Sequence, residues 1–151
     1  MLRINRQTDY AVRVVLALAQ ESMGTRMSTK EIGTAMLIPK NFLPRIVAKL
    51  AQTEIITTFA GRDGGLQLAR IPQEITLKDI VEAFEGPLML SECIPGDDFC
   101  PFEDACNVRP RWTRLQEVIL DELASTSFLD LAEETKAKRS IPPTNILPLS
   151  A

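Results

Sequence analysis

The segment at residues 54–70, EIITTFAGRDGGLQLAR, constrains the fold of this 151-residue chain more than any other feature. Two short runs of β-branched and apolar residues flank GRDGG, a pattern that predicts two antiparallel strands joined by a tight turn. Helical patterns occupy most of the sequence before and after it. We therefore expect a mainly α-helical fold that contains one small β-hairpin.

Three segments before the hairpin have helical patterns. Residues 8–22 repeat apolar side chains at helical spacing, after a Thr–Asp pair that is able to cap the helix. Residues 28–36 begin with a capping box in which Ser28 is the N-cap. Residues 40–52 place their apolar side chains on one face, and their proline is tolerated in a first helical turn. The order helix, helix, short turn, helix, hairpin is that of a winged helix-turn-helix.

In a winged helix-turn-helix the third helix enters the major groove of DNA, and the hairpin, called the wing, lies against the backbone or the minor groove. Basic side chains fall on both of these parts of the chain. Another small α+β domain is the alternative, because helix-turn-helix patterns also arise by chance. The residues that we expect to contact double-stranded promoter DNA are Ser28, Lys40, Asn41, Arg45, Lys49 and Arg62.

The net charge of −3 conceals an asymmetry between the two halves of the chain. Residues 1–72 hold ten Lys and Arg against five Asp and Glu, whereas residues 73–151 hold seven against fifteen. The basic first half favours a surface for a polyanion such as DNA. Two solvated faces of chance composition are the alternative.

The second half predicts helices on either side of a loop that contains every cysteine. Residues 76–86 begin with a capping threonine and end at a glycine. Residues 110–126 form a longer helix, and residues 128–136 add one or two helical turns. Because helix-turn-helix proteins usually bind two half-sites, we expect a homodimer. The expected dimer contact is the apolar stripe of Trp112, Leu115, Ile119 and Leu123. The alternative is that this stripe is part of the core of one chain.

The chain therefore divides into four expected parts. They are a winged helix-turn-helix domain at 1–72, a short helix and cysteine-bearing loop at 73–108, a dimerisation helix and short terminal helix at 109–135, and a mobile tail at 136–151. No apolar run is long enough to span a membrane, and the first residues lack the apolar core of a signal peptide. We expect a cytoplasmic protein with no membrane partner.

Three cysteines and no histidine make the loop unusual. Cys93, Cys100 and Cys106 are separated by six and then five residues. In a reducing compartment an odd number of cysteines favours metal ligands or redox sensors over disulfides. The wide spacing suits an iron–sulfur cluster better than a zinc ion, which more often takes closely spaced pairs. Three unliganded thiols are the remaining interpretation.

An iron–sulfur cluster usually takes four protein ligands, so a fourth must come from elsewhere in the chain, from a partner subunit or from a small molecule. Nearby carboxylate candidates are Glu92, Asp97, Asp98, Glu103 and Asp104. The distant candidate is Asp9, whose alternative role is to cap the first helix. With no histidine and no recognisable pair of nucleophile and base, we expect no enzyme.

Four segments together resemble the Rrf2 family of bacterial winged-helix transcription regulators, over residues 1 to about 135. They are TDYAVRVVLALA, GRDGGLQLAR, ITLKDIVEAFEG and the three-cysteine loop. The resemblance implies a homodimer joined by the long helix after the loop. It also implies an iron–sulfur cluster, 4Fe-4S rather than 2Fe-2S, on Cys93, Cys100 and Cys106, whose state sets the affinity for DNA. Asp9 stands where the nitric-oxide branch of the family has a carboxylate ligand donated by the other subunit.

Three features depart from the family pattern. The first cysteine spacer has six residues, where five is common in the cluster-assembly and nitric-oxide branches. Arg109 stands where the cluster-assembly branch has a histidine ligand. Ala60 stands where the wing usually has an arginine, so a minor-groove contact by the wing falls to Arg62.

These patterns predict a homodimeric DNA-binding regulator whose affinity for promoter DNA is set by a cluster that senses nitric oxide, iron or redox state. One alternative is a winged-helix regulator that uses its cysteines as a thiol or zinc sensor. The other, from a different class, is a carrier or scaffold protein for iron–sulfur clusters.

Overall fold

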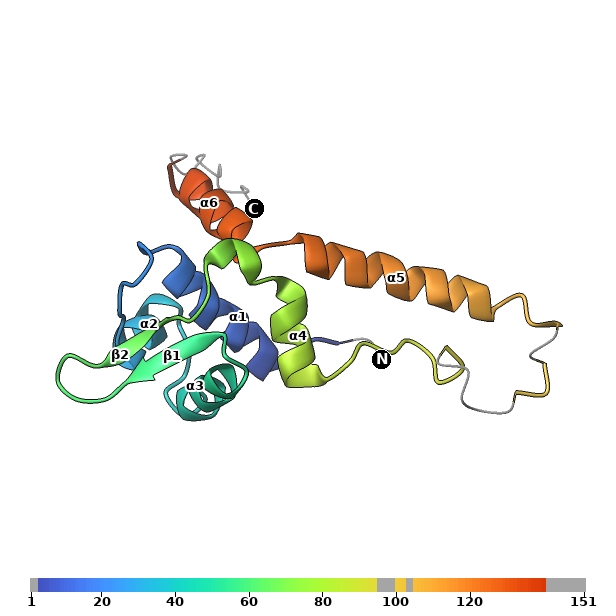
Figure 1. Cartoon of the computed structure of the whole chain (residues 1–151), viewed down its shortest axis with the longest axis horizontal. Coiled ribbons are helices and arrows are strands. Elements are labelled where there is room, and N and C mark those ends of the chain that lie inside the picture. The colour runs from blue at the N-terminus through green and yellow to red at the C-terminus, as the bar shows by residue number, and fades with distance from the viewer. Residues whose placement is uncertain (1–2, 95–99, 103–104, 141–151) are drawn as a thin grey trace, which may run out of the picture.

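The structure, a computed structural model, describes residues 3–94, 100–102 and 105–140 (Figure 1). Its elements in chain order are α1 (Arg6–Ala19), α2 (Thr29–Ala35), α3 (Leu43–Gln52), β1 (Ile56–Phe59), β2 (Gly65–Leu68), the 3-10 turn η1 (Pro72–Glu74), α4 (Leu77–Glu85), α5 (Arg109–Ser125) and α6 (Phe128–Ser140). The predicted fold, mainly α-helical with one β-hairpin, is confirmed. Helix α5 extends away from the body that the other elements form.

Helix α1 is the central element of this body and has α2, α3, α4, α6 and β2 as neighbours. Its apolar side chains at helical spacing, among them Val14 and Leu18, are buried. The predicted Thr–Asp cap is wrong, because Asn5 is the N-cap. The Oδ1 atom of Asn5 accepts hydrogen bonds from the backbone N–H groups of Gln7 at 2.8 Å and Thr8 at 3.0 Å. Thr8 therefore lies inside the helix, where it is buried.

Helices α2 and α3 form the predicted helix-turn-helix. Ser28 caps α2 through the predicted capping box, since its hydroxyl accepts a hydrogen bond from the backbone N–H of Glu31 at 3.2 Å. Helix α3 begins at Leu43, later than the residue 40 that the pattern predicted. The cause is a turn in which the N–H of Phe42 donates to the carbonyl of Pro39 at 3.0 Å.

Strands β1 and β2 form the predicted wing, an antiparallel hairpin in which Phe59 lies opposite Gly65. Strand β2 is also joined to the residue before α2. The N–H of Met27 donates to the carbonyl of Leu66 at 3.0 Å, and the N–H of Leu66 donates to the carbonyl of Met27 at 2.8 Å. The wing is thus attached to the start of α2 as well as to the end of α3.

Thr76 caps the start of α4 and Gly86 follows its last residue, Glu85, as the sequence predicted. Thr76 does so through a capping box, and Gly86 has a φ of +83°. Helix α5 is the long arm of Figure 1, and among its residues the structure buries none. The chain that leads to the cysteine loop lies against α5, because the N–H of Leu90 donates to Oε1 of Gln116 at 2.9 Å.

Helix α6 returns to the body and packs against α1 and η1. The N–H of Phe128 donates to the carbonyl of Ile75 at 2.9 Å, and the Phe128 ring is completely buried. This helix continues to Ser140, past residue 136 where the predicted tail begins. Residues 141–151 of that tail lie outside the described residues. The terminal helix therefore belongs to the core of the winged domain.

We expect Phe128→Ala to lower the free energy of unfolding by about 3–5 kcal/mol, because it removes a buried aromatic ring and leaves a cavity. Urea unfolding followed by circular dichroism, at fixed protein concentration, measures the change. Phe102→Ala is the matched control, since Phe102 is 72% exposed and its loss should cost less than about 0.5 kcal/mol. An unchanged midpoint for Phe128→Ala would mean that α6 is not part of the cooperative core.

Candidate DNA-binding face and cysteine arm

The exposed face of α3 forms the first part of the candidate DNA-binding surface. Arg45 and Lys49 lie one helical turn apart, and Gln52 follows on the same face. These three residues line a hollow of about 560 Å³ together with Gln7, Ala48 and Phe84. Sequence reasoning missed Gln52, which the spacing from Arg45 could have revealed. It also missed Gln7, which only the packing of α1 brings to this hollow.

The turn before α3 adds two exposed polar side chains, Lys40 and Asn41. Lys40 also lines a mainly apolar hollow of about 370 Å³ between α2 and α3. Ser28 already uses its hydroxyl oxygen and its backbone N–H in the capping box, where the N–H donates to Oε2 of Glu31 at 2.7 Å. Its side chain also hydrogen-bonds to the Glu31 carboxylate, which lowers the pKa of Glu31.

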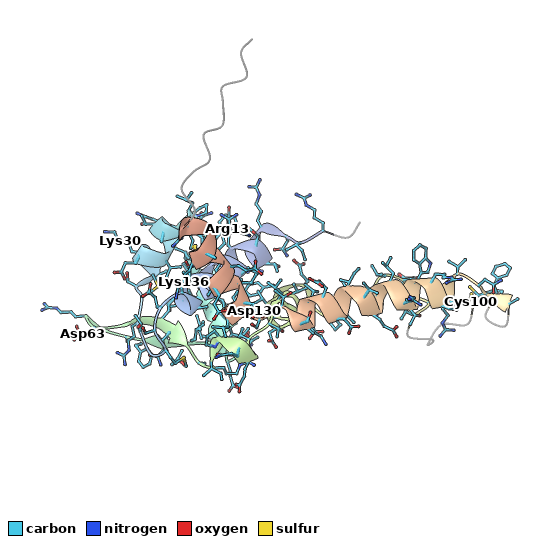
Figure 2. The ribbon with its side chains drawn as sticks, turned by 90° about the horizontal axis from the view of Figure 1, so that it is seen from above. Arg13, Lys30, Asp63, Cys100, Asp130 and Lys136 are labelled. Carbon is cyan, nitrogen blue, oxygen red and sulfur yellow. The ribbon has the colours of Figure 1, made fainter. Side chains whose placement is uncertain are left out.

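The wing places Arg62 at its exposed tip. The N–H of Gly64 donates to the carbonyl of Gly61 at 3.1 Å and closes the turn around Arg62 and Asp63. Figure 2 shows Asp63 at the outer end of the hairpin, on the side of the body away from the α5 arm. The tip is therefore free to approach a neighbouring molecule.

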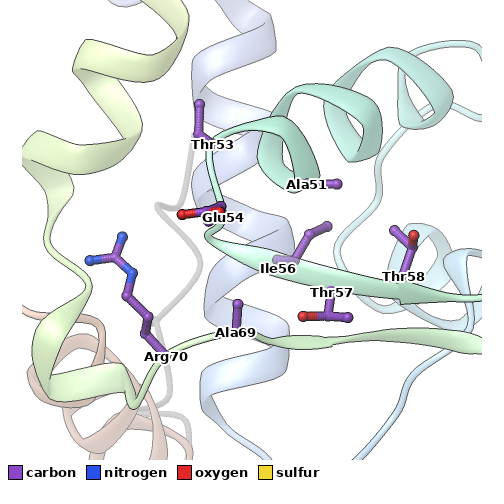
Figure 3. Close-up of a pocket in the computed structure, with 8 residues that line it drawn as sticks. All are labelled: Ala51, Thr53, Glu54, Ile56, Thr57, Thr58, Ala69 and Arg70. Carbon is purple, nitrogen blue, oxygen red and sulfur yellow. The ribbon is translucent and has the colours of Figure 1, made fainter.

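A further hollow lies at the base of the wing, between the end of α3 and the hairpin (Figure 3). Its charged residues are one carboxylate, Glu54, and one guanidinium, Arg70, which also donates from Nη1 to the carbonyl of Glu74 at 3.3 Å. Its other lining residues are Ala51, Thr53, Ile56, Thr57, Thr58 and Ala69. This set offers neither a pair of carboxylates nor a thiol, so it is not a candidate metal or catalytic site.

The three cysteines lie at and near the end of the α5 arm, and all three thiols are free and half-buried. The Sγ atom of Cys93 lies 3.1 Å from Oγ of Ser91. Cys106 precedes α5, and its Sγ accepts a hydrogen bond from the backbone N–H of Arg109 at 3.3 Å. That hydrogen bond, together with one from the N–H of Val108, lowers the pKa of the Cys106 thiol. The arm thus favours a thiolate, the form that binds metals, at Cys106.

A complete ligand set is not assembled in the described part of one chain. Among those residues, no three Cys, Asp or Glu side chains are gathered closely enough to hold a metal ion. Of the nearby carboxylate candidates, Glu92 is exposed beside Cys93. The other four, Asp97, Asp98, Glu103 and Asp104, lie outside the described residues.

Asp9 lies in the first turn of α1, far from the cysteines of its own chain. Its carboxylate pairs with Nη2 of Arg13 at 2.8 Å, and its side chain is 49% exposed. Figure 2 shows Arg13 on the body and Cys100 at the far end of the arm. Since Asn5 caps α1, the alternative capping role for Asp9 is wrong. One chain does not bring Asp9 and the cysteines together.

The predicted dimer stripe divides into two parts along α5. Trp112 and Leu115 are 43% and 45% exposed, and Val118 beside them is 57% exposed. Ile119 and Leu123 are half-buried and line a hollow with the end of α4. None of the helices in the described ranges has the length and hydropathy that a membrane crossing requires.

A hydrogen-bonded lock joins the start of α1 to the end of α4. Oε1 of Glu85 accepts hydrogen bonds from Oγ1 of Thr8 at 2.5 Å and from the backbone N–H of Asn5 at 3.0 Å. The bond from Thr8, and then that from Asn5, lower the pKa of Glu85. Glu85 immediately precedes Gly86, where the chain leaves α4 for the cysteine arm.

Comparison with known proteins gives consistent results. The family model of Rrf2, described as an iron-dependent transcriptional regulator, matches residues 4–134. The HTH-type transcriptional regulator NsrR of Geobacillus kaustophilus is 30% identical over 141 residues, which cover 93% of this chain and 96% of that protein.

Two solved structures are also similar. CymR, described as the global cysteine regulator of B. subtilis, matches with a TM-score of 0.75 and 27% identity, over 89% of this chain and 98% of that chain. IscR of T. potens matches with a TM-score of 0.72 over 93% of both chains, and at 23% identity it supports the fold alone. The similar proteins are transcriptional regulators and not enzymes.

Glu85→Gln should lower stability at pH 7, because the charged carboxylate accepts the bonds from Thr8 and Asn5 more strongly than an amide. The folded-state pKa of Glu85 is lowered, so this stabilisation is present above the unfolded value of about 4.3 and is lost as the pH falls through the lower folded value. Urea midpoints between pH 7 and pH 3 measure it.

We expect the midpoints of wild type and Glu85→Gln to converge at the acid end. Glu21→Gln, which changes an exposed glutamate just past the C-terminal end of α1, should follow the wild type throughout. A difference between Glu85→Gln and wild type that stays constant with pH would contradict the assignment of the lock to the ionised carboxylate.

Proposed function

We propose that this chain, which belongs to the Rrf2 family of iron-dependent transcriptional regulators, binds promoter DNA as a homodimer and responds through an iron–sulfur cluster. One observation carries the proposal. The cysteines lie at the end of the α5 arm, along which Trp112, Leu115 and Val118 are exposed in the described part of the chain. An arm of this kind needs a second copy, both to bury its apolar side chains and to complete its ligands.

The exposed residues of α5 support pairing of two arms. Trp112, Leu115 and Val118 recur at spacings that bring them to one side of the helix. Burial of large apolar side chains against a second copy removes their surface from water, which drives association. The self-complementary contact of a twofold dimer would place one arm along the other. This arrangement also presents two copies of α3 to two half-sites of DNA.

The donor set fits an iron–sulfur cluster in its chemistry. Three free thiols lie in one arm, and the lowered pKa of Cys106 favours the thiolate. Cys93, Cys100 and Cys106 would hold the cluster, 4Fe-4S in preference to 2Fe-2S, with Asp9 of the partner subunit as the fourth ligand. A bound cluster supplies iron that responds to nitric oxide, iron supply or redox state.

Contacts around Asp9 support coupling to the DNA-binding face. Arg13, the ion-pair partner of Asp9, also donates from Nη1 to the carbonyl of Met36 at 3.4 Å, at the end of α2. Tyr10, next to Asp9, packs edge-on against Phe42 with 5.1 Å between ring centroids, at the start of α3. If Asp9 exchanged its ion pair with Arg13 for a bond to the cluster, the contacts of this segment with the end of α2 and the start of α3 would change. We infer that this change alters the position of α3 relative to DNA.

A second candidate is a winged-helix regulator that senses through its thiols or through zinc. It is favoured by the absence of a gathered ligand set in the described part of one chain, and by similarity to a protein described as a global cysteine regulator. In this function the free thiols react or bind zinc without a fourth ligand from Asp9. The two candidates share DNA binding and differ in what the cysteines hold.

Protein isolated without oxygen should be brown and contain iron and acid-labile sulfide, and Cys106→Ser should lose both. We expect Asp9→Ala to remain dimeric but to bind the cluster less stably, because one ligand is removed. Visible and Mössbauer spectra measure the cluster and distinguish 4Fe-4S from 2Fe-2S. Asp63→Ala, a change of an aspartate in the wing, is the matched control.

A colourless protein with one zinc ion per chain, or with no metal, would favour the second candidate. An Asp9→Ala spectrum and nitric-oxide response identical to those of the wild type would remove Asp9 from the ligand set.

Leu115→Glu should convert the homodimer into a folded monomer, because it places a charge in a seam of apolar side chains. Light scattering after gel filtration gives the mass, and circular dichroism checks the fold. Leu37→Glu is the matched control, since Leu37 is 81% exposed in the turn after α2, away from the arm. A wild-type protein that is already monomeric, or a dimeric Leu115→Glu variant, would contradict pairing along α5.

Arg45→Ala should weaken binding to a duplex that the wild-type protein selects from a random-sequence pool. Loss of one phosphate contact should reduce the slope of log affinity against log salt by about 1. Fluorescence anisotropy at several salt concentrations measures both quantities. Arg139→Ala, which removes an exposed charge on α6, should change neither. Failure of the cluster-loaded and apo forms alike to bind any duplex would contradict a DNA-binding function.

A further inference from the structure

Arg26 makes two contacts with the wing, although it lies before α2 and outside the hairpin. Its guanidinium carbon Cζ lies 3.7 Å from the centroid of the Phe59 ring, a cation–π distance. Its Nη1 donates to the carbonyl of Asp63 at 3.2 Å. One side chain therefore holds both the end of β1 and the turn at the tip of the wing.

The backbone around the hairpin leaves space for the Arg26 side chain beside the Phe59 ring. Phe59 lies opposite Gly65, so no cross-strand side chain covers the ring from that position. A Cβ atom on Gly65 would lie 2.8 Å from the carbonyl oxygen of Met27 and 3.5 Å from Cβ of Arg26. Glycine thus permits the close approach of the segment 26–27 to the wing, and the two hydrogen bonds between Met27 and Leu66 fix it there.

The contact at Asp63 acts on the residue beside it. Arg62 and Asp63 are the two central residues of the turn that the Gly61–Gly64 hydrogen bond closes. Holding the carbonyl of Asp63 restricts the rotation of this turn and with it the direction of the Arg62 side chain. The residue before the first glycine of the turn is Ala60, whose uncharged side chain cannot contact a phosphate. Arg62 is therefore the cationic residue of this turn.

We propose that Arg26 is a positioning residue for the wing: it clamps Phe59 and Asp63 so that Arg62 is presented to DNA. This proposal rests on the DNA-binding function proposed above. Arg26 acts from the body of the domain, whereas Arg62 makes the contact with DNA.

The clamp is testable without DNA, through the exchange of the Gly64 amide hydrogen measured by NMR. Loss of the cation–π contact and of one hydrogen bond in Arg26→Ala should speed this exchange about fivefold. Phe59→Leu keeps an apolar side chain but removes the ring, and adding Arg26→Ala to it should have a smaller effect than in the wild type. Arg139→Ala is the control for a lost surface charge. Unchanged exchange in Arg26→Ala overturns the clamp.

A double-mutant cycle with Arg62 tests the role in DNA binding, on the duplex that the wild-type protein selects. Arg26→Ala should weaken binding about fivefold in the wild type and leave the affinity of Arg62→Ala unchanged, because its effect passes through Arg62. Equal losses in both backgrounds would mean that Arg26 contacts DNA itself, which overturns positioning. No loss in the wild-type background, or an Arg62→Ala variant that binds normally, also overturns it.

The two experiments separate this proposal from the function on which it rests. If the wild-type protein selects no duplex, the DNA-binding function fails and the DNA role of Arg26 fails with it, while the exchange measurement still decides the clamp. If the duplex is bound and the cycle is additive, DNA binding stands and the positioning role alone is rejected.

Discussion

The burial of α1 is the constraint on which the other features of this protein depend. Its apolar side chains can leave water only if other elements close around it, and α2, α3, α4 and α6 do so. Protein interiors are close-packed, so a shift of this helix cannot be absorbed locally. The first turn of α1 carries Asp9, the proposed ligand, and Thr8, which hydrogen-bonds to Glu85 of α4. One helix therefore joins the core, the candidate ligand and the helix-turn-helix.

The lock at Glu85 gives the cysteine arm a mechanical connection to that helix. Glu85 ends α4, and the chain passes through Gly86 directly into the arm. The same carboxylate holds the cap residue Asn5 and the buried Thr8 of α1. Under the proposed function, this connection and the contact of Tyr10 with Phe42 form a path of direct contacts from the arm to α3.

Features that depend on neighbouring residues were predictable from sequence, and features that depend on distant residues were not. The hairpin, the capping box at Ser28 and the cap at Thr76 are local, and all three are confirmed. The cap of α1 was predicted wrongly because Thr8 is itself a good cap, and its partner Glu85 lies 77 residues away in sequence. The clamp by Arg26 was equally invisible, since nothing near it in sequence marks Phe59 as its partner.

The sequence places the three cysteines in one loop, but it does not show where that loop lies relative to Asp9. Helix α5 has 17 residues and spans about 25 Å, and it holds the thiols away from the body that carries Asp9. A stiff helix cannot fold back to close that distance, so within the described part of one chain Asp9 stays apart from the cysteines. Under the proposed function, the complete ligand set exists only where the end of one arm meets α1 of the partner subunit. Whatever strengthens the pairing of the two subunits therefore favours the complete ligand set. In this proposal a change at the cluster alters the geometry of the dimer and thereby the affinity for DNA, although the cysteines do not contact DNA.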